Sequence, residues 1–247
     1  MRILRWILVA WLVSSCDINR LLTSAGDVPG APVATKLAFT SQPAEAEAGG
    51  AITPAVEVAV LDGAGNPSAA FDGLVTVALD RNPGGATLSG TMSVAAVHGV
   101  ATFQDLRLDR AGSGYTLAAR AGNTLPPVES DSFVVVPGSA VTLAFTGQPS
   151  NALPGETIQP PVRVTAFDAL GNVATGYTGD VDLVIFDDGS LTMNAVLSGH
   201  TTVAAAKGVA IFADLSIDQP GRGYTLAAAF GAGDLIAKSA TFNIGVP

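Results

Sequence analysis

The sequence predicts an all-β protein built from two tandem β-sandwich domains. The first observation is an internal duplication: residues 36–135 and 142–244 carry the same landmarks in the same order, beginning with LAFTSQP and LAFTGQP. The second is the alternation of apolar and polar residues over short segments, which marks strands with one buried face. The third is the spacing of turn signals between these segments, without a useful length of the 3.6-residue period of an amphipathic helix.

The repeat period of about 105 residues is too long for a solenoid unit and suits a complete small domain. The offset between the copies shifts by three residues before Gly90 and Gly199 and is constant from there to the end. We therefore predict one domain over residues 36–136 and a second over residues 141–245. The linker between them, residues 137–140, is short and contains a proline, so we expect little bending at this point.

The strands are expected at equivalent places in the two copies. In one early strand, Val56, Val58 and Val60 fall on a single face, and Val162, Val164 and Ala166 repeat this pattern in the second copy. Further strands are expected at 74–79, 99–103 and 133–136 in the first copy and at 181–185, 208–212 and 241–244 in the second. Phe103 and Phe212 occupy equivalent positions in one of these pairs and are expected to fill the space between the sheets.

A D-x-x-G-x-G-Y motif ends at Tyr115 in the first copy and at Tyr224 in the second. Each tyrosine follows a glycine-rich bend and begins a strand, which is where immunoglobulin-like domains place a tyrosine corner whose hydroxyl bonds back to the backbone. The alternative is a tyrosine that faces a ligand. The identical position in both copies favours the structural role.

The chain resembles a known family through these segments: FTSQP and FTGQP, the strand and turn V-x-V-x-V/A-x-D-x-x-G-N, VAAVHGVATF and VAAAKGVAIF, and D-x-x-G-x-GYTL. They are similar to the bacterial immunoglobulin-like repeats of surface proteins, broadly of the invasin/intimin and filamin types. The resemblance covers both copies. It implies immunoglobulin-like sandwiches, a place at the cell surface and a role as stalk, spacer or adhesion module.

Residues 1–15 are expected to be a signal peptide. Arg2 and Arg5 precede an apolar run of about ten residues, which is too short to span roughly 30 Å of hydrocarbon. Cys16 follows directly, and residues 13–16 resemble the lipobox of bacterial lipoproteins, in which the cysteine becomes the lipidated N-terminus. The alternative is a free thiol in an ordinary signal peptide. A lone cysteine at this boundary favours lipidation of Cys16.

Residues 16–35 are rich in proline, glycine and small polar residues, so we expect them to form a tether between Cys16 and the first domain. Two or three acyl chains are enough for stable anchoring. We therefore expect an extracytoplasmic protein of the cell envelope that is held to a membrane by its N-terminal lipid, with inner and outer membrane both left open. No second cysteine exists, so no disulfide supports either core.

Charge and composition exclude several classes of protein. The net charge is −9, and removal of Arg2 and Arg5 with the signal peptide would take it to about −11. This argues against a nucleic-acid partner and against electrostatic docking on anionic lipid. The two histidines, His98 and His200, are not at equivalent positions, and no catalytic motif is present. We expect neither enzymatic activity nor a cofactor.

A few polar residues remain as candidates for binding. Asp187, Asp188 and Ser190 lie where the second copy is three residues longer and could line a ligand-binding loop. The D-x-x-G-N sequences supply Asp62 with Asn66 and Asp168 with Asn172, which could hold calcium between domains, although plain turns are favoured.

The predicted function is a membrane-anchored structural or interaction protein. The alternative is a glycan- or peptide-binding module of the envelope, or an accessory subunit of a larger surface complex. Both tryptophans, Trp6 and Trp11, lie in the signal peptide, which weighs against a sugar-stacking site. A peptide that adds to an exposed strand edge would leave no mark in the sequence.

Overall fold

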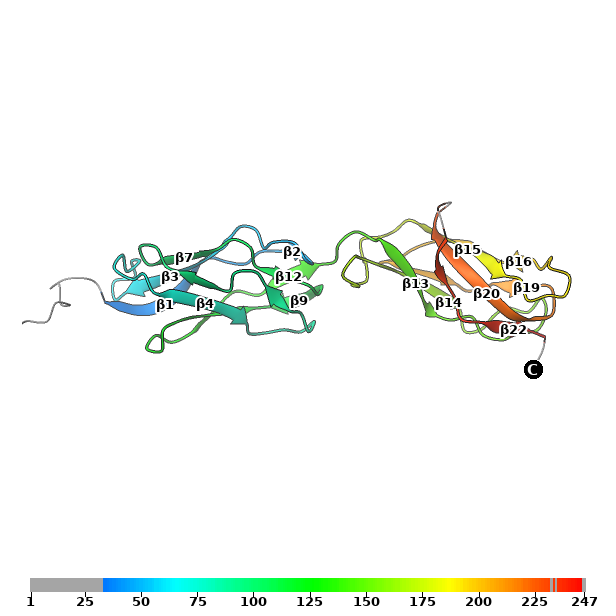
Figure 1. Ribbon diagram of the computed structural model, residues 1–247, viewed down its shortest axis with the longest axis horizontal. Helices are drawn as coiled ribbons and strands as arrows, with labels where there is room; N and C mark the ends of the chain where they lie inside the picture. The colour runs from blue at the N-terminus through cyan, green and yellow to red at the C-terminus, as the bar shows by residue number, and fades with distance from the viewer. Residues whose placement is uncertain (1–32, 232, 234, 246–247) are drawn as a thin grey trace, which may run out of the picture.

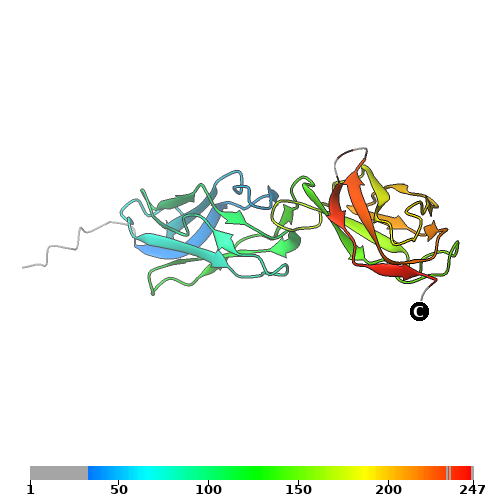
Figure 2. The same cartoon turned by 45° about the vertical axis from the view of Figure 1, so that its right-hand side comes forward.

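The structure is a computed structural model of the 247-residue chain, and it describes residues 33–231, 233 and 235–245. The described residues form strands, turns and loops, without a helix. Two β-sandwiches lie end to end, as the two ribbon views show (Figures 1 and 2). The predicted fold class, all-β with two tandem immunoglobulin-like sandwiches, is confirmed. The predicted signal peptide, Cys16 and most of the tether lie outside the described residues.

The first domain contains twelve strands. Its longer strands follow the period-2 pattern of the sequence, and the shorter ones lie in connecting segments. They are β1 (Ala34–Ser41), β2 (Ala46–Glu47), β3 (Val56–Asp62), β4 (Leu74–Leu79), β5 (Leu88–Ser89), β6 (Ser93–Ala95), β7 (Val100–Phe103), β8 (Arg107–Leu108), β9 (Gly112–Tyr115), β10 (Leu117–Ala121), β11 (Val128–Glu129) and β12 (Phe133–Val136).

The second domain repeats this arrangement. Its strands are β13 (Thr142–Gly147), β14 (Val162–Phe167), β15 (Asp180–Asp187), β16 (Leu197–Ser198), β17 (Thr202–Ala204), β18 (Val209–Phe212), β19 (Ser216–Ile217), β20 (Gly221–Phe230), β21 (Leu235–Lys238) and β22 (Phe242–Ile244). β20 corresponds to β9 and β10 of the first domain, which the short break at Thr116 separates.

The two domains have matching sheets. In the first, β1-β3-β7 forms one sheet and β11-β10-β4-β6 the other, while β12 pairs with β2 and β9. In the second, β13-β14-β18 corresponds to the first of these sheets and β17-β15-β20-β21 to the second, with β22 also paired to β20. The strands described pair antiparallel, apart from the parallel pair of β2 and β12, and an isolated parallel bridge joins Ala152 to Ile244 of β22 in the second domain. This is the layered sandwich architecture of immunoglobulin-like domains.

Each domain buries its own hydrophobic core. The first cluster of buried residues extends from Leu37 to Val135 and the second from Leu143 to Ile244, with no residue in common. Phe103 and Phe212 are 1% and 0% exposed and lie between the sheets of their own domains. Each domain therefore has a separate core of its own.

A buried tyrosine ties a bend to the core in each domain. The hydroxyl of Tyr115 donates to the carbonyl of Arg110 at 2.9 Å, and that of Tyr224 donates to the carbonyl of Gln219 at 2.9 Å. Both side chains are 0% exposed. Burial raises the pKa of each phenol, so the hydroxyl remains a donor. The bend of each domain is therefore held in a defined position relative to its core.

We predict that Phe103→Ala and Phe212→Ala each destabilise only their own domain. Removing a fully buried phenylalanine side chain costs about 3–5 kcal/mol, a large part of the stability of a small domain without disulfides. Calorimetry should give two transitions, with one lowered in each variant. A single transition that shifts equally in both variants would contradict the independence of the two cores.

Candidate functional site: the interdomain joint

The turn after β14 is built by its own sequence. Asp168 Oδ1 accepts hydrogen bonds from the backbone amides of Leu170 at 2.9 Å and Asn172 at 2.8 Å. The turn after β3 is the same: Asp62 Oδ1 accepts from the backbone amides of Ala64 and Asn66, both at 2.9 Å. Aspartate favours such turns because its side chain replaces a backbone acceptor. The D-x-x-G-N motif therefore forms one local structure twice.

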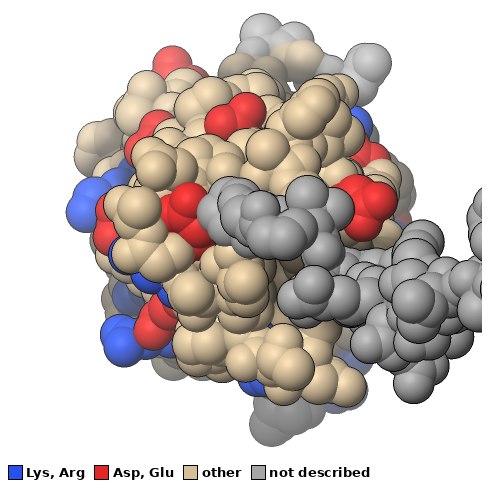
Figure 3. Space-filling model, turned by 90° about the vertical axis from the view of Figure 1, so that its left-hand side faces the viewer, with Lys and Arg blue, Asp and Glu red and all other residues tan. Residues whose placement is uncertain are grey.

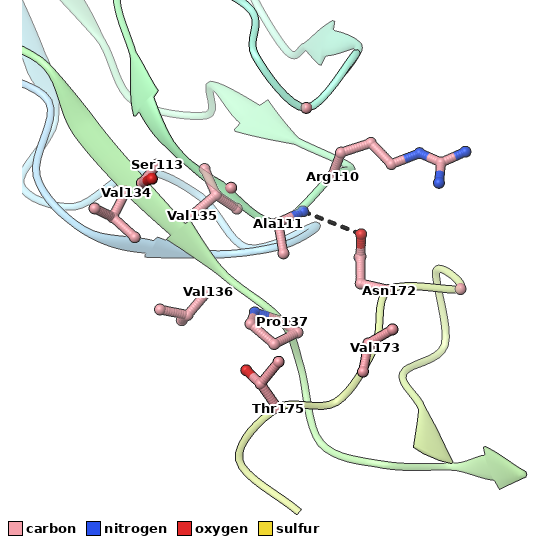
Figure 4. A pocket seen from close by; sticks show the side chains of 13 residues that line it. Arg110, Ala111, Ser113, Val134, Val135, Val136, Pro137, Asn172, Val173 and Thr175 are labelled. Atoms are coloured by element: carbon pink, nitrogen blue, oxygen red, sulfur yellow. Dashed lines mark hydrogen bonds between the residues drawn. The ribbon is translucent and has the colours of Figure 1, made fainter. Parts of the chain in front are cut away.

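In the second domain, the side chain of Asn172 extends from this turn to the first domain. Its Oδ1 accepts from the backbone amide of Ala111 at 3.0 Å, and its Nδ2 donates to the carbonyl of Asp109 at 3.1 Å (Figure 4). The same Nδ2 also donates to Asp168 Oδ2 at 3.0 Å. Asn172 is only 8% exposed. Its amide thus bonds the bend of the first domain to the turn of the second.

The linker and an apolar contact complete the joint. The backbone amide of Gly138 donates to Asp168 Oδ2 at 3.0 Å, which fastens the linker to the second domain. The side chain of Leu170 lies against Gly49 of the first domain, where φ is +78° and an added Cβ would come within 2.9 Å of Leu170 Cδ1. Only glycine combines this backbone conformation with such a close approach.

The bend that receives Asn172 is the one held by Tyr115. Because the Tyr115 hydroxyl bonds the carbonyl of Arg110, the flanking groups of Asp109 and Ala111 are fixed relative to the first core. A hydrogen bond to this bend therefore links the second domain to an element that is held to the core of the first domain. The joint is a direct connection between two packed cores and does not depend on the linker alone.

Asp168 has no free acceptor for a further ligand. Its two oxygens accept four hydrogen bonds, from the amides of Leu170, Asn172 and Gly138 and from the Asn172 side chain. Burial alone would raise the pKa of Asp168, but the hydrogen bonds from Asn172 and from the backbone amides outweigh it and lower that pKa below 3.8. A carboxylate in this state has used all of its lone pairs.

Within the part of the chain that the structure describes, the equivalent turn of the first domain has no such partner. Asn66 is exposed, whereas Asn172 is buried. This turn lies at the end of the first domain that points away from the second, and Figure 3 looks onto that end. Asp and Glu side chains are spread over the described part of this face, and Lys and Arg lie near its margins. The two copies of the motif therefore have the same fold and different surroundings.

A groove runs along the joint. It has a volume of about 610 Å³ and is bordered by backbone and side chains of both domains, among them Arg110, Ser113, Val134, Val173 and Thr175 (Figure 4). Its described lining contains no aromatic residue. A groove of this size could hold a ligand, but it offers a sugar no stacking surface.

The acidic residues of the longer loop have partners within the protein. Asp187 Oδ2 pairs with Lys238 Nζ at 2.6 Å and accepts from the hydroxyl of Thr225 at 2.6 Å. Asp188 accepts from the backbone amides of Ser190 and Ala195, both at 2.9 Å. Ser190 is 6% exposed, so its hydroxyl is not offered to a ligand from solvent. The fold therefore keeps Asp188 beside Ser190 and directs Asp187 to Lys238 and Thr225.

Two other observations concern the described residues only. They hold no group of three or more His, Cys, Asp or Glu side chains suited to a metal ion. No helix among them is long and apolar enough to cross a membrane. His200 Nδ1 lies 2.6 Å from Asp214 Oδ2 in an exposed pair, and His98 lies in a turn with φ of 52°.

Sequence reasoning did not find the partners of Asn172. The groups it bonds on the first domain are a carbonyl and a backbone amide, which every residue except proline carries and which leave no pattern in a sequence. One signal was present: the repeat places Leu170 opposite Ala64, so the larger apolar side chain appears in the copy whose turn contacts the other domain.

The chain matches no protein-family model and no curated protein. Among solved structures, it is similar to domains 4–9 of the surface layer protein SbsC, at 22% identity and a TM-score of 0.33, over 86% of this chain and 32% of that one. It is also similar to a C-terminal fragment of intimin in complex with the intimin-binding domain of the translocated intimin receptor, at 14% identity and a TM-score of 0.31, over 86% and 64%.

A fragment of the titin I-band, I67–I69, matches at 17% identity and a TM-score of 0.27, over 86% of this chain and 66% of that one. The chain thus spans about a third of the SbsC structure and just under two thirds of the intimin fragment. These proteins are tandem immunoglobulin-like arrays.

We predict that calcium leaves the joint unchanged. Since Asp168 has no unused lone pair and Asn172 has no unused amide group, a cation would have to break hydrogen bonds before it could bind. Addition of millimolar calcium or of a chelator should leave both the scattering profile and the melting transitions as they were. A rise in either melting temperature with calcium would show that these turns do bind the metal.

Proposed function

We propose that this protein is a lipid-anchored, extracytoplasmic spacer of the cell envelope, with a structural rather than a catalytic role. The observation that carries the proposal is the Asn172 joint, which links two sandwiches end to end through hydrogen bonds between their folded parts. A spacer must transmit orientation as well as length. A joint made only of a flexible linker would transmit neither.

The proposed cellular location of the protein rests on its sequence. The resemblance of residues 13–16 to a lipobox and the resemblance of the repeats to surface-protein modules support an anchored protein that projects from a membrane. In this arrangement the first domain stands next to the tether and the second is held beyond it. The acidic surface of the rod would keep it soluble and limit its adhesion to anionic surfaces.

A second candidate is a peptide-binding module, which the groove along the joint favours. Its lining offers backbone groups, Arg110 and Ser113 beside apolar side chains such as Val134. The lack of an aromatic lining makes a peptide a better fit than a glycan. Saturable binding in a peptide array that Val134→Lys abolishes would support this candidate, and a glycan array provides the matched comparison.

We predict that Asn172→Ala loosens the joint and that Asn66→Ala does not. Both changes keep the hydrogen bonds from backbone amides to the Asp carboxylate that shape the local turn, although Asn172→Ala also removes the bond from its side chain to Asp168. Only Asn172→Ala removes bonds between domains, each of which contributes about 0.5–1.5 kcal/mol.

Small-angle scattering on residues 33–247 should show a wider distribution of interdomain angles for Asn172→Ala and an unchanged one for Asn66→Ala. Melting temperatures of both domains report whether folding is intact. Equal profiles for wild type and Asn172→Ala would refute the rigid joint. The peptide candidate is tested separately, by the peptide array.

We predict that Cys16→Ser releases the protein from the membrane or leaves it unprocessed. The wild type should partition into detergent, because two or three acyl chains give stable anchoring. Fractionation and mass determination of the mature N-terminus provide the measurement. A soluble wild type that begins at another residue would rule out the lipid anchor.

A further inference from the structure

The end of the second domain that points away from the first differs from the end of the first domain that forms the joint. In the first domain, this end receives its neighbour through the backbone amide of Ala111. The repeat offset that pairs Gly90 with Gly199 places Pro220 opposite Ala111. Proline has no backbone N–H, so it cannot donate to an asparagine of a following domain. The end therefore lacks one of the two hydrogen bonds that the joint uses.

The loop at this end has also changed. Asp188 accepts from the amide of Ala195 as Asn82 accepts from the amide of Ala86, so the three extra residues of the second domain lie between Asp188 and Ala195. In the first domain the shorter loop lies close to the tyrosine corner, because an added Cβ at Gly84 would lie 2.1 Å from the hydroxyl oxygen of Tyr115. The second domain contains three extra residues here, and its loop follows a different course. The short loop beside the joint in the first domain thus corresponds to a longer loop in the second domain.

This loop, residues 188–196, exposes apolar side chains at its tip. Leu191 is 101% exposed, Met193 74% and Val196 54%. No charged residue occurs between positions 189 and 199. The loop connects β15 to β16, at the end of the second domain that points away from the first (Figure 1). An uncharged apolar tip thus lies at the far end of an otherwise acidic rod.

The two ends of the loop are held by hydrogen bonds within the protein. Asp188 accepts from the amides of Ser190 and Ala195, and the amide of Val196 donates to Asp218 Oδ1 at 2.8 Å. The hydroxyl of Thr192 donates to Asn194 Oδ1. Removing water from a polar group is costly only when the group loses its hydrogen bond. The ends of the loop can therefore approach a surface at low cost, while Leu191 and Met193 at its tip gain free energy by leaving water.

We propose that residues 188–196 form a lipid-contacting tip that inserts Leu191 and Met193 into the headgroup–acyl boundary of a bilayer. A protruding loop with fully exposed apolar side chains suits a surface that closes around them. The loop contains no Lys or Arg and the chain is acidic, so the favoured surface is zwitterionic rather than anionic. This inference goes beyond the proposed spacer, which assigns no role to the distal end.

A single tryptophan can report the insertion, because residues 33–247 contain none. Leu191→Trp is the reporter. Val97→Trp is the matched control, because Val97 is 67% exposed between β6 and β7 of the first domain. With phosphatidylcholine vesicles, emission should shift to the blue for Leu191→Trp and remain unchanged for Val97→Trp. Adding phosphatidylglycerol at low salt should weaken the shift.

A second pair of variants measures affinity by vesicle flotation. Leu191→Asp should lower the vesicle-bound fraction at least about tenfold, since it replaces one buried leucine with a charge. Val97→Asp should leave it unchanged, and calorimetry shows whether both variants keep the two melting transitions. Equal blue shifts at both positions, or no shift at either, would overturn the proposal. Loss of binding to an envelope protein in Leu191→Asp, without any vesicle effect, would overturn it in favour of a protein partner.

Discussion

The side-chain amide of Asn172 is the interaction on which the arrangement of the molecule depends. A primary amide has two N–H donors and an oxygen acceptor, and here each finds a partner: Asp168 in its own turn, and the carbonyl of Asp109 and the amide of Ala111 in the first domain. A buried amide that loses a partner costs about 1–3 kcal/mol. One orientation of the two domains satisfies the whole group, and other orientations leave part of it unpaired.

The joint uses structures that each domain would form on its own. The turn of Asp168 has a counterpart at Asp62 that forms without any neighbour, so contact between the domains is not what shapes it. The receiving bend is held by Tyr115, which is part of the first core. Since both halves are in place before they meet, docking orders few additional side chains. The entropic cost of the joint is correspondingly small.

The duplicated domains have diverged where their surroundings differ. Leu170 replaces the alanine of the first copy at the position that contacts Gly49, and Pro220 replaces Ala111 at the end where no third domain follows in the described residues. The outer face of β15 has changed too: Phe186 is 52% exposed, with Lys238 Nζ 4.6 Å from the centre of its ring. The core positions have stayed alike because the same fold has to be filled twice. These differences make the two domains non-equivalent: the far end of the first domain is suited to contact the second domain, and the far end of the second domain is suited to a different surface.

The sequence by itself determined the fold class, the duplication and much of the core, because these depend on local periodicity and on residues that recur at equivalent positions. The valines of β3 and the pair Phe103 and Phe212 follow from alternation alone. Only the tertiary structure decided what the polar motifs do. Asp187 and Asp188 look like a ligand set in one dimension, yet the fold turns the first to Lys238 and the second to the amides of its own loop. Asn172 looks like a turn residue identical to Asn66, and its role depends on a carbonyl and an amide more than sixty positions away in the chain. Backbone groups carry no sequence signal, so a contact made through them appears only when the chain is folded.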